Sequence, residues 1–314
     1  METDAQPVKL TDQFAFGLAM IMLSAVFFGL VPFFARSLTE AGIAPPAVAF
    51  FRYLISPLLF FRFLVLRGPG SSATYWGLAS GILLGLGWVG YVNALELMPV
   101  STAGILYMTY PIFTLLISWL FFGDRPTLRM SIASGLILLA AIIAAAPSGG
   151  AEFPLHSILF ALLAPFAFGI GINILTHKLV ALPPISRMVA GPLGSAVVLL
   201  PLMATYPIDA IIPKDPSVWV LLIGIGVITA TLPQFIYVVF APKIGASATG
   251  VAGSVELPTM FLVGYMAFGE DITLAQFLAG ALVLAAITLS GAKRVRNIAT
   301  NVAVARSRKK ARKN

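Results

Sequence analysis

Long apolar segments alternate with short polar ones along almost the whole chain. The apolar segments are long enough to cross a bilayer as α-helices, which takes roughly 20 mostly apolar residues. The connections are rich in proline, glycine and serine, as at 67–71 and 146–150, and none could hold a soluble domain. The pattern predicts an all-α integral membrane protein with ten transmembrane helices. The ten predicted spans lie at about 14–37, 46–66, 74–97, 100–122, 128–146, 155–178, 185–206, 217–241, 245–268 and 274–292.

The composition supports this assignment and excludes several kinds of site. The chain is 59% hydrophobic and 10% charged, whereas soluble domains carry about 25% charged residues. It has no cysteine, and its two histidines, His156 and His177, cannot form a metal site alone. We therefore expect no metal and no cofactor. The net charge of +8 reflects loops and one tail, so we expect a lipid bilayer and no nucleic acid as partner.

The distribution of basic residues predicts the orientation. With the N-terminus inside, eight Lys and Arg in loops and nine in the tail are cytoplasmic, against Arg36 and Lys214 outside. The positive-inside rule then places both termini in the cytoplasm. The first apolar segment is too long for a secretory signal, so we interpret it as an uncleaved span. Residues 1–13 are the expected cytoplasmic N-terminus, and 293–314 the expected basic cytoplasmic tail.

The two halves of the chain share an internal repeat. Pro111 and Gly123-Asp124 in the first half correspond to Pro258 and Gly269-Glu270 in the second, and 134–142 corresponds to 279–287. The offset is about 140–147 residues. Five spans in each half give the halves opposite orientations in the membrane, an arrangement typical of transporters. We predict two inverted five-helix repeats at 14–150 and 151–292; a duplicated structural bundle is the alternative.

These features resemble the drug/metabolite transporter superfamily, specifically the EamA-type members and their bacterial aromatic amino-acid exporter branch. The resemblance rests on ten spans, two halves, and the Pro…Gly-Asp/Glu endings of spans four and nine. It implies a multi-pass protein of the bacterial cell inner membrane that exports amino acids or related metabolites. We expect a monomer or weak homodimer. In the small multidrug relatives the coupling acid lies in span one, whereas 14–37 contains no acid here.

Span nine contains the most unusual residue of the membrane region. Glu256 lies near the middle of 244–270, two residues before Pro258. An acid at the bilayer centre costs about 3 kcal/mol on insertion scales, so it usually faces a cavity or a partner. Glu256 therefore either lines a substrate cavity, exchanging a proton or holding an ammonium group, or is a buried structural acid. The prolines interrupt their helices, so Pro111 and Pro258 are predicted hinges.

Other polar and aromatic residues at membrane depth are candidates for the same cavity. Most of their aromatic rings would also suit the protein core or the interface belt. Arg52 could bind a substrate carboxylate or pair with Glu256, Gln234 could form an interhelical hydrogen bond, and His156 is expected at the outer rim. The further candidate substrate-binding residues are Trp88, Tyr91, Tyr107, Tyr110, Phe168, Asn173 and Tyr237.

Span three carries one further pattern, with Gly77, Gly81 and Gly85 at four-residue spacing. Residues four apart share a helix face. Small residues on one face allow close helix packing in membranes. We therefore expect span three to pack tightly against another helix.

The functional classes can be weighed from these residues. No catalytic set is present, so we expect no enzyme, and a pseudo-twofold monomer argues against a channel, whose pore is usually formed by an oligomer. A sugar nucleotide would require several basic residues at mid-depth, and only Arg52 comes close. We expect a secondary transporter for small-molecule substrates, namely amino acids or similar metabolites, with broad specificity. The remaining alternatives are a sugar nucleotide or a drug-like cation.

Overall fold

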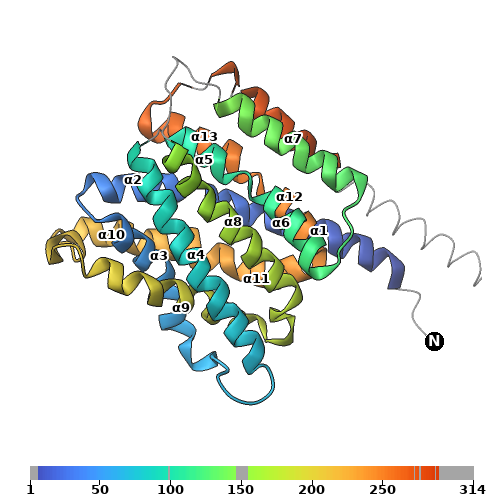
Figure 1. Ribbon diagram of the computed structural model, residues 1–314, viewed down its shortest axis with the longest axis horizontal. Coiled ribbons are helices and arrows are strands. Elements are labelled where there is room, and N and C mark those ends of the chain that lie inside the picture. Colours follow the sequence, from blue (N-terminus) through green and yellow to red (C-terminus); the bar gives the residue numbers. More distant parts are fainter. Residues whose placement is uncertain are drawn as a thin grey trace, which may run out of the picture.

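The computed structural model describes residues 6–97, 100–145, 155–271, 273–275, 277–286 and 288–289. Within these ranges every regular element is helical, and the helices pack side by side in one bundle (Figure 1). The α-helices are α1 (Gln6–Gly29), α2 (Val31–Glu40), α3 (Pro45–Phe60), α4 (Ser71–Leu97), α5 (Val100–Tyr107), α6 (Tyr110–Phe122), α7 (Leu128–Ala145), α8 (Leu155–His177), α9 (Pro184–Met203), α10 (Pro216–Gly226), α11 (Leu232–Ile244), α12 (Ala246–Gly253) and α13 (Glu256–Phe268). Short 3-10 turns η1 (Phe61–Phe63), η2 (Leu179–Ala181) and η3 (Ile208–Ala210) and the π-helical turn η4 (Val227–Thr231) connect them.

The helices confirm an all-α membrane protein. Six helical stretches, three of them divided into two α-helices, are long and apolar enough to cross a membrane, and three shorter apolar helices accompany them in the described ranges. Large apolar side chains face outward from the bundle, including Phe121, Leu128 and Met266, which are 78%, 77% and 80% exposed. Outward apolar surface of this extent suits contact with lipid.

Four of the predicted spans are interrupted rather than continuous. Span one is divided into α1 and α2, span four into α5 and α6, span eight into α10 and α11, and span nine into α12 and α13. Each later segment has a proline within its first three residues: Pro32, Pro111, Pro233 and Pro258. Proline lacks the N–H of the helical ladder and its ring clashes with the carbonyl four residues earlier, so the preceding turn opens. The predicted hinges Pro111 and Pro258 therefore lie directly after helix breaks.

Helix α4 is held against α9 by small residues. A Cβ atom on Gly81 would overlap the backbone carbonyl of Gly191, and one on Gly77 would lie 2.6 Å from the Cβ of Ala190. The hydroxyl of Ser195 donates a hydrogen bond to the Gly81 carbonyl at 2.7 Å. The glycine face of span three thus forms the close contact expected of it, and the backbones touch because no side chain intervenes.

Helices α6 and α13 end in the same way. Each is 13 residues long and is followed by a glycine with positive φ, Gly123 at 74° and Gly269 at 65°. The backbone N–H groups of Asp124 and Glu270 then bond to the carbonyls of Ser118 and Gly264, both at 3.1 Å. Glycine adopts this left-handed conformation without steric cost. The repeat seen in the sequence therefore produces matching helix ends.

Candidate functional site

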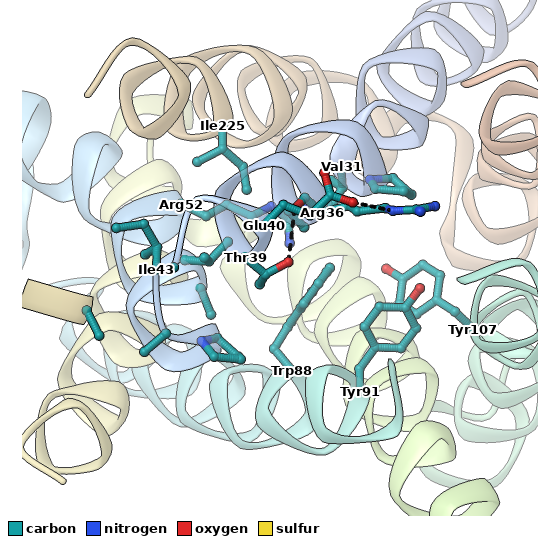
Figure 2. A pocket seen from close by; sticks show the side chains of 18 of the residues that line it. Val31, Arg36, Thr39, Glu40, Ile43, Arg52, Trp88, Tyr91, Tyr107 and Ile225 are labelled. Carbon is teal, nitrogen blue, oxygen red and sulfur yellow. Dashed lines mark hydrogen bonds and ion pairs between the residues drawn. The ribbon is translucent and has the colours of Figure 1, made fainter. Parts of the chain in front are cut away.

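A cavity of about 840 Å³ lies between α2, α3, α4, α5 and α13 (Figure 2). Its deep part is lined by Arg52, Trp88 and Glu256, whose exposed fractions are 5%, 7% and 4%. Its shallow part is lined by Glu40 and Tyr206, both exposed residues near inter-helix loops. The cavity therefore extends from the buried centre of the bundle to one end of the protein.

Arg52 is a buried cation on the cavity wall. It belongs to α3 and donates from Nη1 to the Tyr53 hydroxyl at 3.2 Å and from Nη2 to the Thr229 carbonyl at 3.3 Å. Its guanidinium lies 4.3 Å from the centre of the Trp88 ring. Thr229 is part of the π-helical turn η4, where the regular α-helical bonding is interrupted. Arg52 is thus held by a carbonyl, a phenol and an aromatic face.

Glu256 is the first residue of α13 and follows the break after α12. The N-terminal end of a helix carries a partial positive charge, which stabilises a carboxylate there. Both Glu256 and Arg52 line the cavity. Within the part of the chain that the structure describes, the ion pairs do not include one between Glu256 and Arg52. A buried acid and a buried cation therefore border the same space without being paired directly.

An aromatic wall adjoins these two charges. The ring centres of Trp88 and Tyr91 are 5.2 Å apart, and those of Tyr91 and Tyr107 are 5.7 Å apart. Phe168 of α8 stacks on Tyr107 at 5.9 Å from behind. Trp88, Tyr91 and Tyr107 line the cavity themselves. This wall can receive an apolar or aromatic group beside the charged one.

Phe168 and Gln234 border a smaller space below the cavity. This space has a volume of about 30 Å³ and shares Arg52, Trp88 and Tyr107 with the main cavity. Phe168 and Gln234 line this smaller space and do not line the main cavity.

Tyr110 and Tyr237 are buried behind the break between α12 and α13. Their hydroxyl groups both approach Gly253, and a Cβ atom there would lie 2.6 Å from the Tyr237 oxygen and closer still to that of Tyr110. Gly253 is needed at this position because any side chain would displace both tyrosines. These tyrosines therefore support the helix break next to Glu256 from behind the cavity wall.

The structure places two of the predicted site residues away from the cavity. Asn173 of α8 donates from Nδ2 to the carbonyls of Thr114 and Gly169, both at 2.9 Å, and so connects α8 to α6. His156 is exposed at the beginning of α8, with its ring 6.4 Å from that of Phe160. Neither lines the cavity.

The shallow end contains charged residues that the sequence reasoning did not select. Arg36 of α2 pairs with Glu40 at 2.9 Å and with Glu270 at 3.1 Å, and all three line the cavity. A signal was present, since Arg36 and Glu40 are four residues apart, a spacing that brings side chains together on a helix. The partner in Glu270 is 234 residues away and could not be inferred from that spacing.

Comparisons with known proteins agree with a transporter. Residues 15–146 match a model of the EamA-like transporter family. An uncharacterized transporter of Archaeoglobus fulgidus is 26% identical over 282 residues, covering 88% of this chain and 96% of that protein. An S-adenosylmethionine uptake transporter of Rickettsia bellii is 25% identical over 228 residues, covering 71% of this chain and 75% of that protein.

A crystal structure of another protein shows the same fold, with a TM-score of 0.68 and 17% sequence identity, covering 87% of this chain and 96% of that one. The relatives' names include transport but not the export of aromatic amino acids. The family match covers the first half of the chain, and the relatives extend into the second. Together these similarities support membrane transport as the activity, and the likeness to the EamA-like transporter family model extends over residues 15–146.

Proposed function

We propose that the protein is a secondary transporter that exports amino acids or related small metabolites by alternating access. The proposal rests on the charges that line the cavity. One buried acid, Glu256, and one buried cation, Arg52, border the same space and are not paired with each other. Charged groups inside a membrane are costly and usually serve a substrate or ion path. An amino acid has both complementary charges.

The cavity suggests how such a substrate would bind. Its carboxylate would accept hydrogen bonds from Arg52, and its ammonium group would lie near Glu256. Its side chain would contact the aromatic wall of Trp88, Tyr91 and Tyr107. A volume of about 840 Å³ lies within the range of small-molecule sites, roughly 300–1,000 Å³. The space is larger than one amino acid needs, which favours broad specificity.

A second candidate substrate is an S-adenosyl amino acid, because relatives are named S-adenosylmethionine uptake transporters. Such a molecule combines an amino-acid group with a sulfonium cation and a purine ring. Cations and flat rings both bind well to aromatic faces, and the wall beside Glu256 provides them. A sugar nucleotide is less well matched, because Arg52 is the one basic side chain in the deep part of the cavity lining.

The proposed architecture consists of ten spans in two inverted repeats, residues 14–150 and 151–292, in the bacterial inner membrane. Both termini are cytoplasmic, as the positive-inside rule predicts. The matching ends of α6 and α13 support the repeat. In this orientation Glu40 is outside, so the cavity opens to the outer face. Because the chain has no cysteine, Glu40→Cys and Thr300→Cys can each be labelled alone. Labelling of the second variant from outside would contradict the topology.

Flux measurements in liposomes test the substrate. Purified protein is reconstituted, and the movement of several radiolabelled amino acids, S-adenosylmethionine and one sugar nucleotide is followed, with protein-free liposomes as control. We expect flux of amino acids, with aromatic ones among them. Flux of S-adenosylmethionine without amino acids would favour the second candidate. Flux of the sugar nucleotide alone would refute both.

A further inference from the structure

Arg36 and Glu270 connect two segments that are distant in the sequence. Nη1 of Arg36 in α2 lies 3.1 Å from Oε1 of Glu270, which follows α13 after Gly269. The Arg36 guanidinium also lies over the Phe268 ring, 4.3 Å from its centre. The cation is therefore held both by the acid and by the aromatic residue two positions before it. We call this contact the α2–α13 ion pair.

His177 and Asp124 form a second contact of the same kind, the α6–α8 ion pair. Nε2 of His177, the last residue of α8, lies 2.9 Å from Oδ2 of Asp124, which follows α6 after Gly123. The imidazole stacks on the Phe122 ring at 4.3 Å. The other ring nitrogen, Nδ1, is 2.9 Å from the Asn173 carbonyl oxygen. The Thr176 hydroxyl also lies 3.0 Å from Nδ1. The contact with Asp124 is an ion pair when the imidazole is protonated, since both ring nitrogens then donate, and a hydrogen bond when it is neutral.

The two ion pairs occupy equivalent places in the internal repeat. Phe122-Gly123-Asp124 corresponds to Phe268-Gly269-Glu270 at an offset of 146 residues, and Arg36 and His177, 141 residues apart, each lie near the end of the first predicted span of their half. Both separations lie within the range that relates the two halves. In each pair the acid follows the second helix of an interrupted span, which is α6 of span four or α13 of span nine. The basic residue lies near the end of the first span of the other half. The same type of contact therefore occurs twice in the protein.

The two ion pairs differ in their relation to the cavity. Arg36 and Glu270 line its shallow end, whereas neither Asp124 nor His177 lines it. Both contacts are nevertheless formed, with N–O distances of 3.1 and 2.9 Å, and in each the basic group lies 4.3 Å from the centre of a phenylalanine ring. In an inverted repeat, each half takes the role of the other when the cavity changes sides. One structure therefore shows this contact both at the open end and at the end that the cavity does not reach.

We infer that both ion pairs stay formed throughout the transport cycle, so that α2 moves together with the end of α13, and α6 together with α8. This inference rests on the proposed transport function and on the inverted repeat. A gate would be formed at the closed end and broken at the open end, and the presence of both contacts in one structure contradicts that. Opening and closing must then occur between other helices around the cavity, with these contacts inside the moving units.

Covalent cross-linking tests the inference, because the natural chain has no thiol. The double variants Arg36→Cys/Glu270→Cys and Asp124→Cys/His177→Cys are each treated with a short bifunctional thiol reagent in liposomes. The matched control is the same variant treated with the monofunctional reagent. We expect flux within about twofold of that control, because a contact that never opens loses nothing when it becomes covalent. Loss of flux on cross-linking either pair would overturn the inference.

A distance measurement keeps the test independent of flux. Spin labels at Thr39→Cys and Asp271→Cys report on the α2–α13 pair. Labels at Thr39→Cys and Asn93→Cys report on the separation of α2 and α4 across the cavity, because Asn93 is an exposed residue of α4 that does not line the cavity. With and without substrate, we expect one distance for the first pair of labels and two for the second. Two distances for the first pair would overturn the inference even in the absence of flux. One distance for both, with no flux of any substrate, would refute the alternating-access proposal and, with it, the inference that depends on it.

Discussion

The substitution Glu256→Gln tests the central assignment of the site. Glutamine has nearly the same size as glutamate and still forms hydrogen bonds, but it carries no charge. In the described structure Glu256 is 4% exposed, lines the cavity and belongs to no ion pair. Removing the charge therefore breaks no ion pair within the fold. We expect the variant to insert and fold like the wild type.

The expected loss of substrate affinity follows from the surroundings of the Glu256 carboxylate. A hydrogen bond to a charged group contributes about 1.5–3 kcal/mol, more than a neutral one. Because Glu256 is shielded from solvent on most sides, water and salt weaken its charge little. At 1.4 kcal/mol for each factor of ten, an ammonium-bearing substrate should bind about 10- to 150-fold more weakly to the variant.

The assay measures substrate affinity by quenching of tryptophan fluorescence, since Trp88 lines the cavity, and flux in liposomes. The matched control is Asp209→Asn, which removes an acid that is 66% exposed and pairs with Lys214 at 3.0 Å. That control should behave like the wild type. If Glu256→Gln bound and moved every substrate as the wild type does between pH 6 and pH 8, Glu256 would be a packing residue and the proposed ammonium site would be wrong.

Three further predictions concern neighbouring features. Arg52→Lys keeps the charge but loses the planar group over Trp88, so affinity for substrates with a carboxylate should fall, whereas that for simple amines should not; competition binding measures both. Gly81→Ala should lower the thermal midpoint of unfolding in detergent, because overpacking costs about 1–3 kcal/mol. The control Gly171→Ala should leave the midpoint unchanged, because the space around Gly171 is open. Equal midpoints for the two variants would contradict the close α4–α9 contact. Asn173→Leu should lower the midpoint by removing an interhelical bond worth about 0.6 kcal/mol without changing substrate affinity, and a changed affinity would place Asn173 in the site.

Much of the fold follows from local properties of the sequence. Helices occur in the predicted apolar ranges because a backbone inside lipid must satisfy its own hydrogen bonds. The prolines Pro111 and Pro258 mark breaks because their effect on the preceding turn is local. The glycine ends of α6 and α13 are likewise fixed by nearby residues. Glu256 could be selected as a candidate because an acid in the middle of an apolar span is visible in the sequence and is costly unless it faces a cavity or a partner.

The sequence could not decide which candidates share one cavity. Helical periodicity shows which residues of a helix lie on one face, but it does not show which neighbour that face meets. Tertiary packing brought Arg52 of α3, Trp88 of α4 and Glu256 of α13 to one space, and it placed Asn173 in a contact between α6 and α8 instead. The sequence cannot separate these candidates, because the same types of polar residue bind substrates and form hydrogen bonds between helices.

Long-range charge pairing was also decided by the tertiary structure alone. The sequence identified Arg36, Glu270 and Asp124 as charges near the ends of spans, and its internal repeat related the two acids to each other. The pairing of Arg36 with Glu270 and of His177 with Asp124 depends on which helix ends become neighbours. Local sequence determines where each helix begins and ends, whereas contacts between helix ends depend on how all the helices pack together.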